Sequence, residues 1–159
     1  MYNENLESEN FNNYIIYNSK DKFMNLHPIY LIDDDIDDNE IVQEVWKKLG
    51  LENELVFFQN GDELIRRLKQ DVHNPFIIIC DVNLPKMNGF EIREKLLNDP
   101  ETRYKTVPFI FWSNSVSDVQ IKKAYDLAAH GMFIKGSTME ELEKTFTRIV
   151  DYWQVSLKP

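Results

Sequence analysis

Four apolar stretches of the sequence each run directly into polar residues whose side chains could take part in one reaction. These stretches end on Asp33 and Asp34, on Asp81, on Ser113 and on Lys135. A carboxylate can attack a phosphoryl group and form an acyl phosphate, and this chemistry needs positioning and charge neutralisation more than covalent work by the protein. Three carboxylates, a hydroxyl and an ammonium in one site would therefore suit metal-assisted transfer of a phosphoryl group to an aspartate.

The strands and helices expected to position these residues alternate strictly along the chain. Short apolar runs bounded by polar or turn residues indicate buried strands, here 29–32, 54–58, 76–80, 108–112 and 132–134. Amphipathic helices are predicted at 39–49, 62–69, 89–98 and 117–129, with a last helix opening at Thr138. Such alternation predicts an α/β fold with three α/β/α layers around a doubly wound, five-stranded parallel sheet. The common strand order for this size is the flavodoxin-like 2-1-3-4-5.

Apolar periodicity predicts which helix faces pack on the sheet. The first helix should bury Ile41, Val45 and Leu49 and end at Gly50 as a C-cap. The other expected core positions are Leu64, Ile65 and Leu68, then Ile121, Ala124 and Leu127, and finally Leu142, Phe146, Ile149 and Val150. Thr138 followed by Glu141 predicts a capping box at the start of the last helix.

The acidic residues after the first and third strands are expected to share one binding site. In an open doubly wound sheet, ligands bind outside the carboxyl ends of the strands at the switch point, where Asp33, Asp34 and Asp81 would meet. Two carboxylates about 5 Å apart repel by roughly 3 kcal/mol at an effective dielectric near 20, so a cation is expected among them. Ligands that are all oxygens favour Mg²⁺. Asp37 and Asp38 are interpreted as a solvated charge run that caps the first helix. The same interpretation is the alternative to cation binding for Asp33 and Asp34.

Composition limits the class and the partners of the protein. The 159 residues fit one globular domain, with 43% hydrophobic and 13% aromatic residues. A net charge of -9 argues against a nucleic-acid surface. The single cysteine, Cys80, lies in a predicted strand and is interpreted as a core residue. No apolar stretch approaches the roughly 20 residues of a membrane span, so we expect a cytoplasmic protein without a membrane partner.

The first 26 residues differ in composition from the rest. They are rich in Asn, Glu and Ser, with Tyr14 to Tyr17 as the main apolar point. We expect a flexible leader at 1–26 before a single domain at 27–159. A start of translation at Met24 is the alternative.

The strand-end residues, in their order and spacing, resemble the receiver domain of two-component response regulators, the CheY-like family. The resemblance is carried by the acidic pair, by the segment from Asp81-Val-Asn-Leu-Pro to Gly89, and by Ser113 and Lys135. It covers about residue 28 to the C-terminus. The long polar connection 98–108 resembles that of stand-alone receivers paired with sensor kinases, including phytochrome-linked ones.

The resemblance implies a role for each of these residues. Asp81 would accept phosphate from the phosphohistidine of a sensor histidine kinase, in a signalling domain rather than an enzyme. Mg²⁺ would be held by Asp34, Asp81 and the backbone carbonyl of Asn83, with Asp33 assisting through water. Ser113 and Lys135 would bind the oxygens of the phosphoryl group.

Three positions depart from the family pattern, the mildest being Ser113, a tolerated alternative to the commoner threonine. The proline that usually follows the lysine is replaced by Gly136, and because a cis bond before a residue other than proline costs about 3 kcal/mol, we expect a trans Lys135–Gly136 peptide. The aromatic switch position of the family falls on Met132, which has no hydroxyl with which to change partners. These departures keep open a binding module of the same fold that works without phosphate.

Output is expected to pass through another protein. The chain stops at Pro159, soon after the last helix, without a helix-turn-helix pattern or a basic patch. The expected surface is formed by the fourth helix, the fifth strand and the fifth helix, with Tyr125, Phe133 and Tyr152 as exposed candidates. A downstream target would bind there, and the same face could carry a homodimer. A relay intermediate that passes phosphate to a histidine phosphotransfer domain is chemically close to this function.

Overall fold

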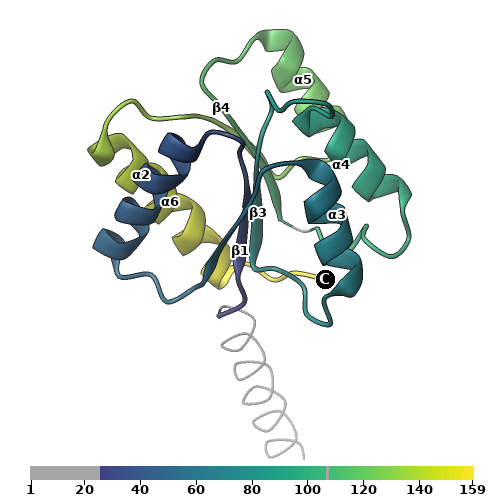
Figure 1. The fold of residues 1–159 in the computed structure, drawn as a ribbon, viewed down its shortest axis with the longest axis horizontal. Coiled ribbons are helices and arrows are strands. Elements are labelled where there is room, and N and C mark those ends of the chain that lie inside the picture. The colour runs from purple at the N-terminus through teal and green to yellow at the C-terminus, as the bar shows by residue number, and fades with distance from the viewer. Residues whose placement is uncertain (1–25, 107) are drawn as a thin grey trace, which may run out of the picture.

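Five parallel strands alternate with five helices in the part of the chain that the structure describes, residues 26–106 and 108–159 of a computed structural model (Figure 1). The strands are β1 (Ile29–Ile32), β2 (Leu55–Phe58), β3 (Ile77–Asp81), β4 (Phe109–Ser113) and β5 (Gly131–Ile134). The helices are α2 (Ile36–Leu49), α3 (Gly61–Gln70), α4 (Gly89–Asn98), α5 (Asp118–Asp126) and α6 (Met139–Val155). The sheet order β2-β1-β3-β4-β5 confirms the predicted fold. The predicted leader, apart from Leu26, and the alternative start at Met24 lie outside the described residues.

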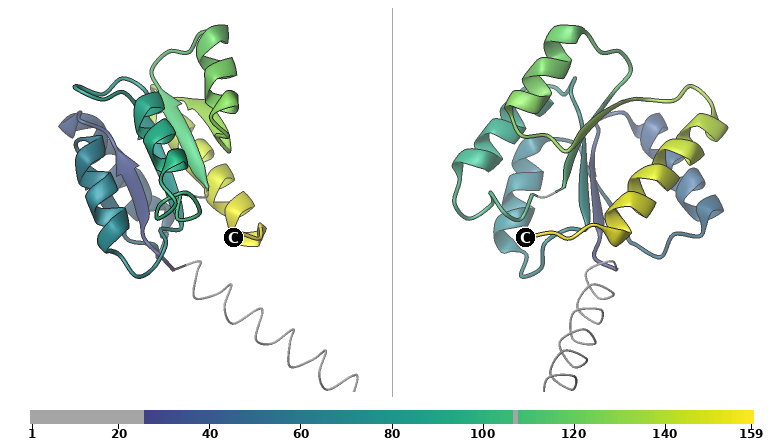
Figure 2. Two further views of the ribbon diagram at one scale, coloured as in Figure 1. Left: turned by 90° about the vertical axis from the view of Figure 1, so that its right-hand side faces the viewer. Right: turned by 180° about the vertical axis from the view of Figure 1, so that it is seen from behind.

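Helices cover both faces of the sheet. Helices α2 and α6 pack on one face, and α3, α4 and α5 pack on the other (Figures 1 and 2). Strands β1, β3 and β4 are buried along their whole length, as expected for parallel strands covered on both sides. Cys80 is fully buried in β3, which confirms it as a core residue, and burial raises the pKa of its thiol well above the usual value. Within the described residues, every helix is too short or too polar to cross a membrane.

Helix α2 begins three residues earlier than predicted because Asp35 caps it. The Asp35 carboxylate accepts hydrogen bonds from the backbone N–H groups of Asp37 and Asp38, at 2.9 and 3.3 Å. This cap satisfies donors that the first helical turn otherwise leaves free. At the other end Gly50 adopts φ 63°, the left-handed conformation of the predicted C-cap. Asp37 and Asp38 are therefore part of the first turn of α2.

The buried face of α2 is rotated from the predicted one. Ile41 is 41% exposed, so the prediction is wrong at this position, and the helix buries Val42, Val45 and Trp46. In α5 the prediction is also wrong at Ile121, which is exposed. Predicted core positions that are buried are Val45, Leu64, Leu68, Ala124, Leu142, Phe146, Ile149 and Val150, whereas Leu49, Ile65 and Leu127 are half-buried.

The capping box predicted at Thr138 forms only in half. The Thr138 hydroxyl accepts a hydrogen bond from the Glu141 N–H at 3.2 Å, but the Glu141 carboxylate accepts from the Ser137 N–H at 2.8 Å. Complete capping boxes instead begin α4 at Asn88 and α5 at Ser117. These two helices are the ones that follow β3 and β4 along the chain.

A buried guanidinium joins α4 to the end of α5. Arg93 is 1% exposed, and it donates to the carbonyls of Leu127 and Ala128 at 3.1 and 2.9 Å. It also donates to the hydroxyl of Thr106 at 2.8 Å and lies over the Phe109 ring at 4.9 Å. Burial lowers the pKa of Arg93 to about 10. The charge is held by neutral oxygens, including carbonyls at the negative end of a helix dipole.

Arg93→Met is expected to lower the free energy of unfolding by about 3 kcal/mol. Methionine fills similar space but leaves several buried carbonyl groups without donors, each at a cost of roughly 1 kcal/mol or more. Arg103→Met is the control, because Arg103 is exposed and, among the described residues, its side chain donates to one carbonyl, that of Leu97. Urea unfolding measures both variants. An equal, small loss in both would show that the Arg93 network contributes nothing beyond packing.

His130, just before β5, should make stability depend on pH. Burial and the charge of Arg93 lower the pKa of His130, and its Nδ1 accepts a hydrogen bond from the Phe109 N–H at 3.1 Å. The unfolded chain therefore takes up a proton at a higher pH than the folded chain does, so stability should fall as the pH drops through the unfolded pKa of about 6.5 to the lower folded pKa. The loss is expected to stay below about 1 kcal/mol because solvent screens the partly exposed ring.

The measurement is the melting temperature across this pH range. His130→Gln keeps a hydrogen-bond acceptor and should make the melting temperature depend less on pH. His73→Gln, at an exposed site, should leave this dependence as in wild type. The same dependence of the melting temperature on pH in wild type and His130→Gln would show that His130 is not its cause.

Candidate functional site

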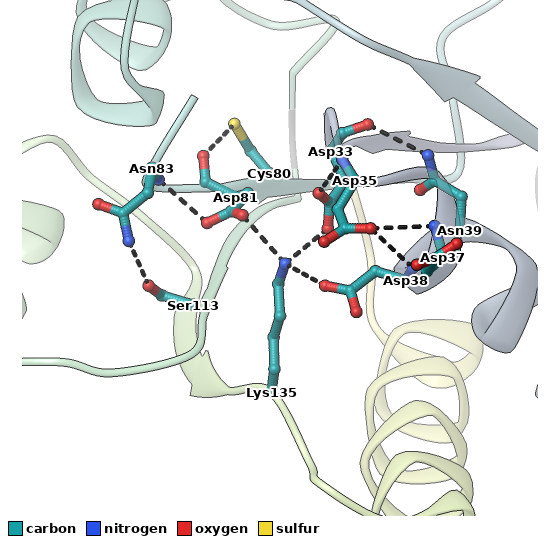
Figure 3. A network of polar contacts seen from close by, with 10 residues as sticks. All are labelled: Asp33, Asp35, Asp37, Asp38, Asn39, Cys80, Asp81, Asn83, Ser113 and Lys135. Atoms are coloured by element: carbon teal, nitrogen blue, oxygen red, sulfur yellow. Dashed lines mark hydrogen bonds and ion pairs between the residues drawn. The ribbon is translucent and has the colours of Figure 1, made fainter. Parts of the chain in front are cut away.

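The carboxyl ends of four strands bring the predicted residues to one edge of the sheet (Figure 3). Asp33 directly follows β1 and Asp81 is the last residue of β3. Ser113 ends β4, and Lys135 directly follows β5. All of these strands are parallel, so their carboxyl ends share one edge. Residues up to 102 positions apart in the sequence are thereby placed in contact.

The Lys135 ammonium lies at the centre of this edge and pairs with three carboxylates. Its Nζ is 2.6 Å from Asp33 Oδ2, 2.9 Å from Asp38 Oδ2 and 3.0 Å from Asp81 Oδ2 (Figure 3). The side chains of Lys135, Asp33 and Asp81 are 5%, 2% and 8% exposed. Loss of one partner from an ion pair buried to this degree strongly destabilises the folded protein, because the other charge remains buried without a partner.

Burial and charge act in opposite directions on the two most buried groups. Burial raises the pKa of Asp33 above its usual value, although the hydrogen bond from Lys135 lowers it. Burial alone would lower the pKa of Lys135, but its hydrogen bonds to the three carboxylates raise that pKa above the usual value. The lysine therefore stays protonated at neutral pH and serves as the cation of the acidic cluster.

Asp81 is held by its neighbours on the following loop. Its Oδ1 accepts a hydrogen bond from the Asn83 N–H at 3.0 Å, and the Asn83 side-chain amide lies 3.3 Å from the buried Ser113 hydroxyl. Gly89 closes this loop by donating to the Val82 carbonyl at 3.0 Å. A Cβ at Gly89 would lie 2.3 Å from the Asp81 carbonyl oxygen, so only glycine lets α4 begin this close to β3.

Two predicted residues lie away from this contact network. Asp34 is exposed, and it lines an open hollow of about 490 Å³ together with Asp81 and Asn83. Met132 is half-buried and packs against the apolar cluster under α3, α4 and α5. Its role as a switch position stays a prediction.

Asp38 belongs to the site although the sequence interpretation placed it in a solvated charge run. That interpretation is wrong for Asp38, whose carboxylate pairs with Lys135. The sequence feature that could have indicated this role is the N-cap at Asp35. With Asp35 as the N-cap, Asp38 lies in the first turn of α2, which follows the carboxyl end of β1. Asp37, its neighbour, is exposed and makes no ion pair within residues 26–106 and 108–159.

The donor set fits a hard divalent cation. Asp33, Asp34 and Asp81 offer only oxygen ligands beside an open hollow, which suits Mg²⁺. Nevertheless, the described residues gather no group of three or more acidic, His or Cys side chains in a geometry that could hold a metal. In Figure 3 the Lys135 ammonium stands between Asp33 and Asp81, where it would repel a divalent cation bound to the same carboxylates. The ammonium would have to withdraw for a metal to bind.

Gly136 leaves no room for the family's usual proline. A Cβ at Gly136 would lie 2.7 Å from the Cβ of Glu141 and 3.1 Å from the Leu142 backbone nitrogen. The loop after Lys135 therefore packs directly against the start of α6 and would have to move to accept a larger residue. The expected trans geometry of the Lys135–Gly136 peptide stays a prediction.

A doubly wound five-stranded sheet with an aspartate ending its central strand, an acidic pair beside it and a lysine after β5 defines the receiver class of signalling domain. Residues 29–147 match the response regulator receiver domain family. The chain belongs to this family, whose members are phosphorylated by histidine kinases and act as two-component signalling domains rather than classical enzymes.

Stand-alone receivers are among its relatives. The chain is 26% identical over 130 residues to the response regulator Rcp1 of Synechocystis sp., covering 79% of this chain and 87% of the relative. It superposes on the phosphorylated cyanobacterial phytochrome response regulator RcpA with a TM-score of 0.74 at 25% identity, covering 84% of this chain and 98% of RcpA. The Mn²⁺-bound form of Rcp1 gives a TM-score of 0.71 at 24% identity, with 84% and 99% coverage. The resemblance inferred from sequence is thus confirmed.

Proposed function

We propose that this chain is a phosphoacceptor response regulator that receives a phosphoryl group on Asp81 from a histidine kinase. The observation that carries the proposal is the ion-paired cluster of Asp33, Asp81 and Lys135 at the carboxyl edge of the sheet. A carboxylate oxygen of Asp81 forms the new O–P bond while the P–N bond of the phosphohistidine breaks, and the leaving imidazole takes up a proton.

Each neighbour of Asp81 has a task in this reaction. The Asn83 N–H holds Oδ1, and Oδ2 faces the Lys135 ammonium. Lys135 neutralises the charge that the phosphoryl oxygens bring, and the Ser113 hydroxyl donates to one of them. The Asn83 amide donates to that hydroxyl at 3.3 Å, which links Ser113 to the loop that follows Asp81.

Mg²⁺ would be held by Asp34, Asp81 and the Asn83 carbonyl, with Asp33 assisting through water. When bound, the ion neutralises charge between the acceptor carboxylate and the phosphoryl oxygens. Similar proteins support a divalent cation but do not identify its ligands here: Rcp1 has a Mn²⁺-bound structure, and the receiver domain of the sensor kinase PA1611 from Pseudomonas aeruginosa has magnesium coordinated in its active-site cleft.

Phosphorylation would switch a protein-binding face formed by α5, β5 and α6. Tyr125, Ile134 and Tyr152 on these elements are about 60% exposed. Phe133 was expected to be exposed too, but this is wrong, because it is half-buried against the core. The partners would be a sensor histidine kinase as donor and a downstream protein or phosphotransfer domain as receiver of the signal.

The test is the intact mass of the full chain after incubation with a small phosphodonor such as acetyl phosphate. We expect a gain of one phosphoryl group with Mg²⁺ and none with a chelator. Alkali should remove the group, as for an acyl phosphate, and peptide mapping should place it on Asp81. Absence of any gain would overturn the proposal and favour the binding module that works without phosphate.

A further inference from the structure

We propose that Asp38 is a positioning residue that gives Lys135 a partner outside the metal-binding oxygens, so that the ammonium can withdraw when a divalent cation enters. The inference rests on the proposed function in taking Asp34, Asp81 and the Asn83 carbonyl as the cation's ligands, with Asp33 assisting through water. It concerns a residue that the proposed reaction itself does not use.

The ammonium and a divalent cation compete for the same carboxylates. Two of the three partners of Lys135, Asp33 and Asp81, are also among the residues proposed to hold or assist the cation. A dication placed beside an ammonium that still contacts both would meet strong repulsion in this buried site. Lys135 therefore has to give up at least part of these contacts when the metal binds.

Asp38 is the partner that the metal leaves free. Its carboxylate comes from the first turn of α2, is 32% exposed and lies 2.9 Å from Lys135 Nζ. In the described part of the chain, Lys135 is the only hydrogen-bond partner of this carboxylate. The positive end of the α2 dipole favours a negative charge at this place. Asp38 can thus keep the ammonium paired while Asp33 and Asp81 turn to the metal.

The structure also has room on the Asp38 side. A hollow of about 400 Å³ lies between α2 and the loop after β5, lined by Asp38, Trp112, Lys135 and Gly136 among others. The Trp112 ring lies 5.8 Å from the ammonium and offers it a further favourable surface. An ammonium that moves toward α2 therefore keeps an anion and an aromatic ring as neighbours.

The test is the affinity of the full chain for Mg²⁺, followed through amide chemical shifts during titration with MgCl₂ at physiological ionic strength. Asp38→Asn should weaken binding roughly tenfold, the worth of a hydrogen bond between charged groups. Asp37→Asn is the matched control: it removes the same charge from the same helical turn without touching Lys135, so the loss of a screened attraction to the cation should weaken the affinity only about twofold. Asp38→Glu should restore most of the affinity.

A double-mutant cycle separates positioning from direct metal binding. In a Lys135→Met background, the effect of Asp38→Asn should shrink to that of Asp37→Asn. Equal effects of the two asparagine variants in the wild-type background would overturn the inference. A tenfold effect that persists without Lys135 would also overturn it, because Asp38 would then act on the metal itself.

The same titrations distinguish failure of the inference from failure of the proposed function. If the wild type binds Mg²⁺ but takes up no phosphoryl group, the proposed function fails while the Asp38 comparison still decides the inference. If the wild type binds no Mg²⁺, the inference fails together with the metal part of the proposed function.

Discussion

Asp81→Asn is expected to abolish phosphoryl uptake completely. An amide is a far weaker nucleophile than a carboxylate, and the substitution also removes one of the oxygens proposed to hold Mg²⁺. The fold should survive, because asparagine has the same shape and its oxygen can still accept the Asn83 N–H that Asp81 Oδ1 accepts at 3.0 Å. The measurement is intact mass after incubation with acetyl phosphate and Mg²⁺.

The matched control is Asp37→Asn, a nearby exposed acid that makes no ion pair within the described residues. This variant should gain one phosphoryl group, as the wild type does. A phosphoryl group retained by Asp81→Asn would move the acceptor to another carboxylate at this edge. Peptide mapping of that product would then identify Asp33 or Asp34 as the acceptor.

Lys135→Met should lower the free energy of unfolding by about 3–5 kcal/mol in the presence of a chelator. The substitution leaves Asp33 and Asp81, which are 2% and 8% exposed, without the cation that pairs with both. Buried charges without a partner are costly because the protein interior solvates them poorly. Urea unfolding measures the loss, and addition of MgCl₂ should recover part of it by supplying another cation.

The same variant should gain stability on acidification relative to wild type. Burial already raises the pKa of Asp33 above its usual value, and removal of the ammonium raises it further. The folded state then binds a proton at a pH where the unfolded state does not, so stability falls as the pH rises from the unfolded value near 3.9 through the folded pKa. Lys144→Met, which removes an exposed lysine paired with Glu140, is the control and should cost less than about 1 kcal/mol. Equal stability of Lys135→Met and wild type in chelator would show that the carboxylates need no cation.

The sequence by itself determined the fold and most of the site. Buried parallel strands appear as continuous apolar runs, and strict alternation with helices leaves few topologies, since crossovers are right-handed. The end of a strand is a sharp boundary in such a pattern. Asp33, Asp81, Ser113 and Lys135 could therefore be placed at the carboxyl edge without any knowledge of their contacts.

Only the tertiary structure decided which helix residues face that edge. Successive residues lie about 100° apart around an α-helix, so taking Ile41 rather than Val42 as a core position turns the predicted buried face by that amount. Packing against the sheet buries Val42, Val45 and Trp46 and leaves Ile41 exposed. The same packing brings Asp38 to Lys135, 97 residues away in the sequence. Arg93 is a second example, because the carbonyls that it binds just after α5 lie 34 and 35 residues away. Such contacts depend on side-chain direction and on the packing of distant elements, and local sequence patterns carry neither.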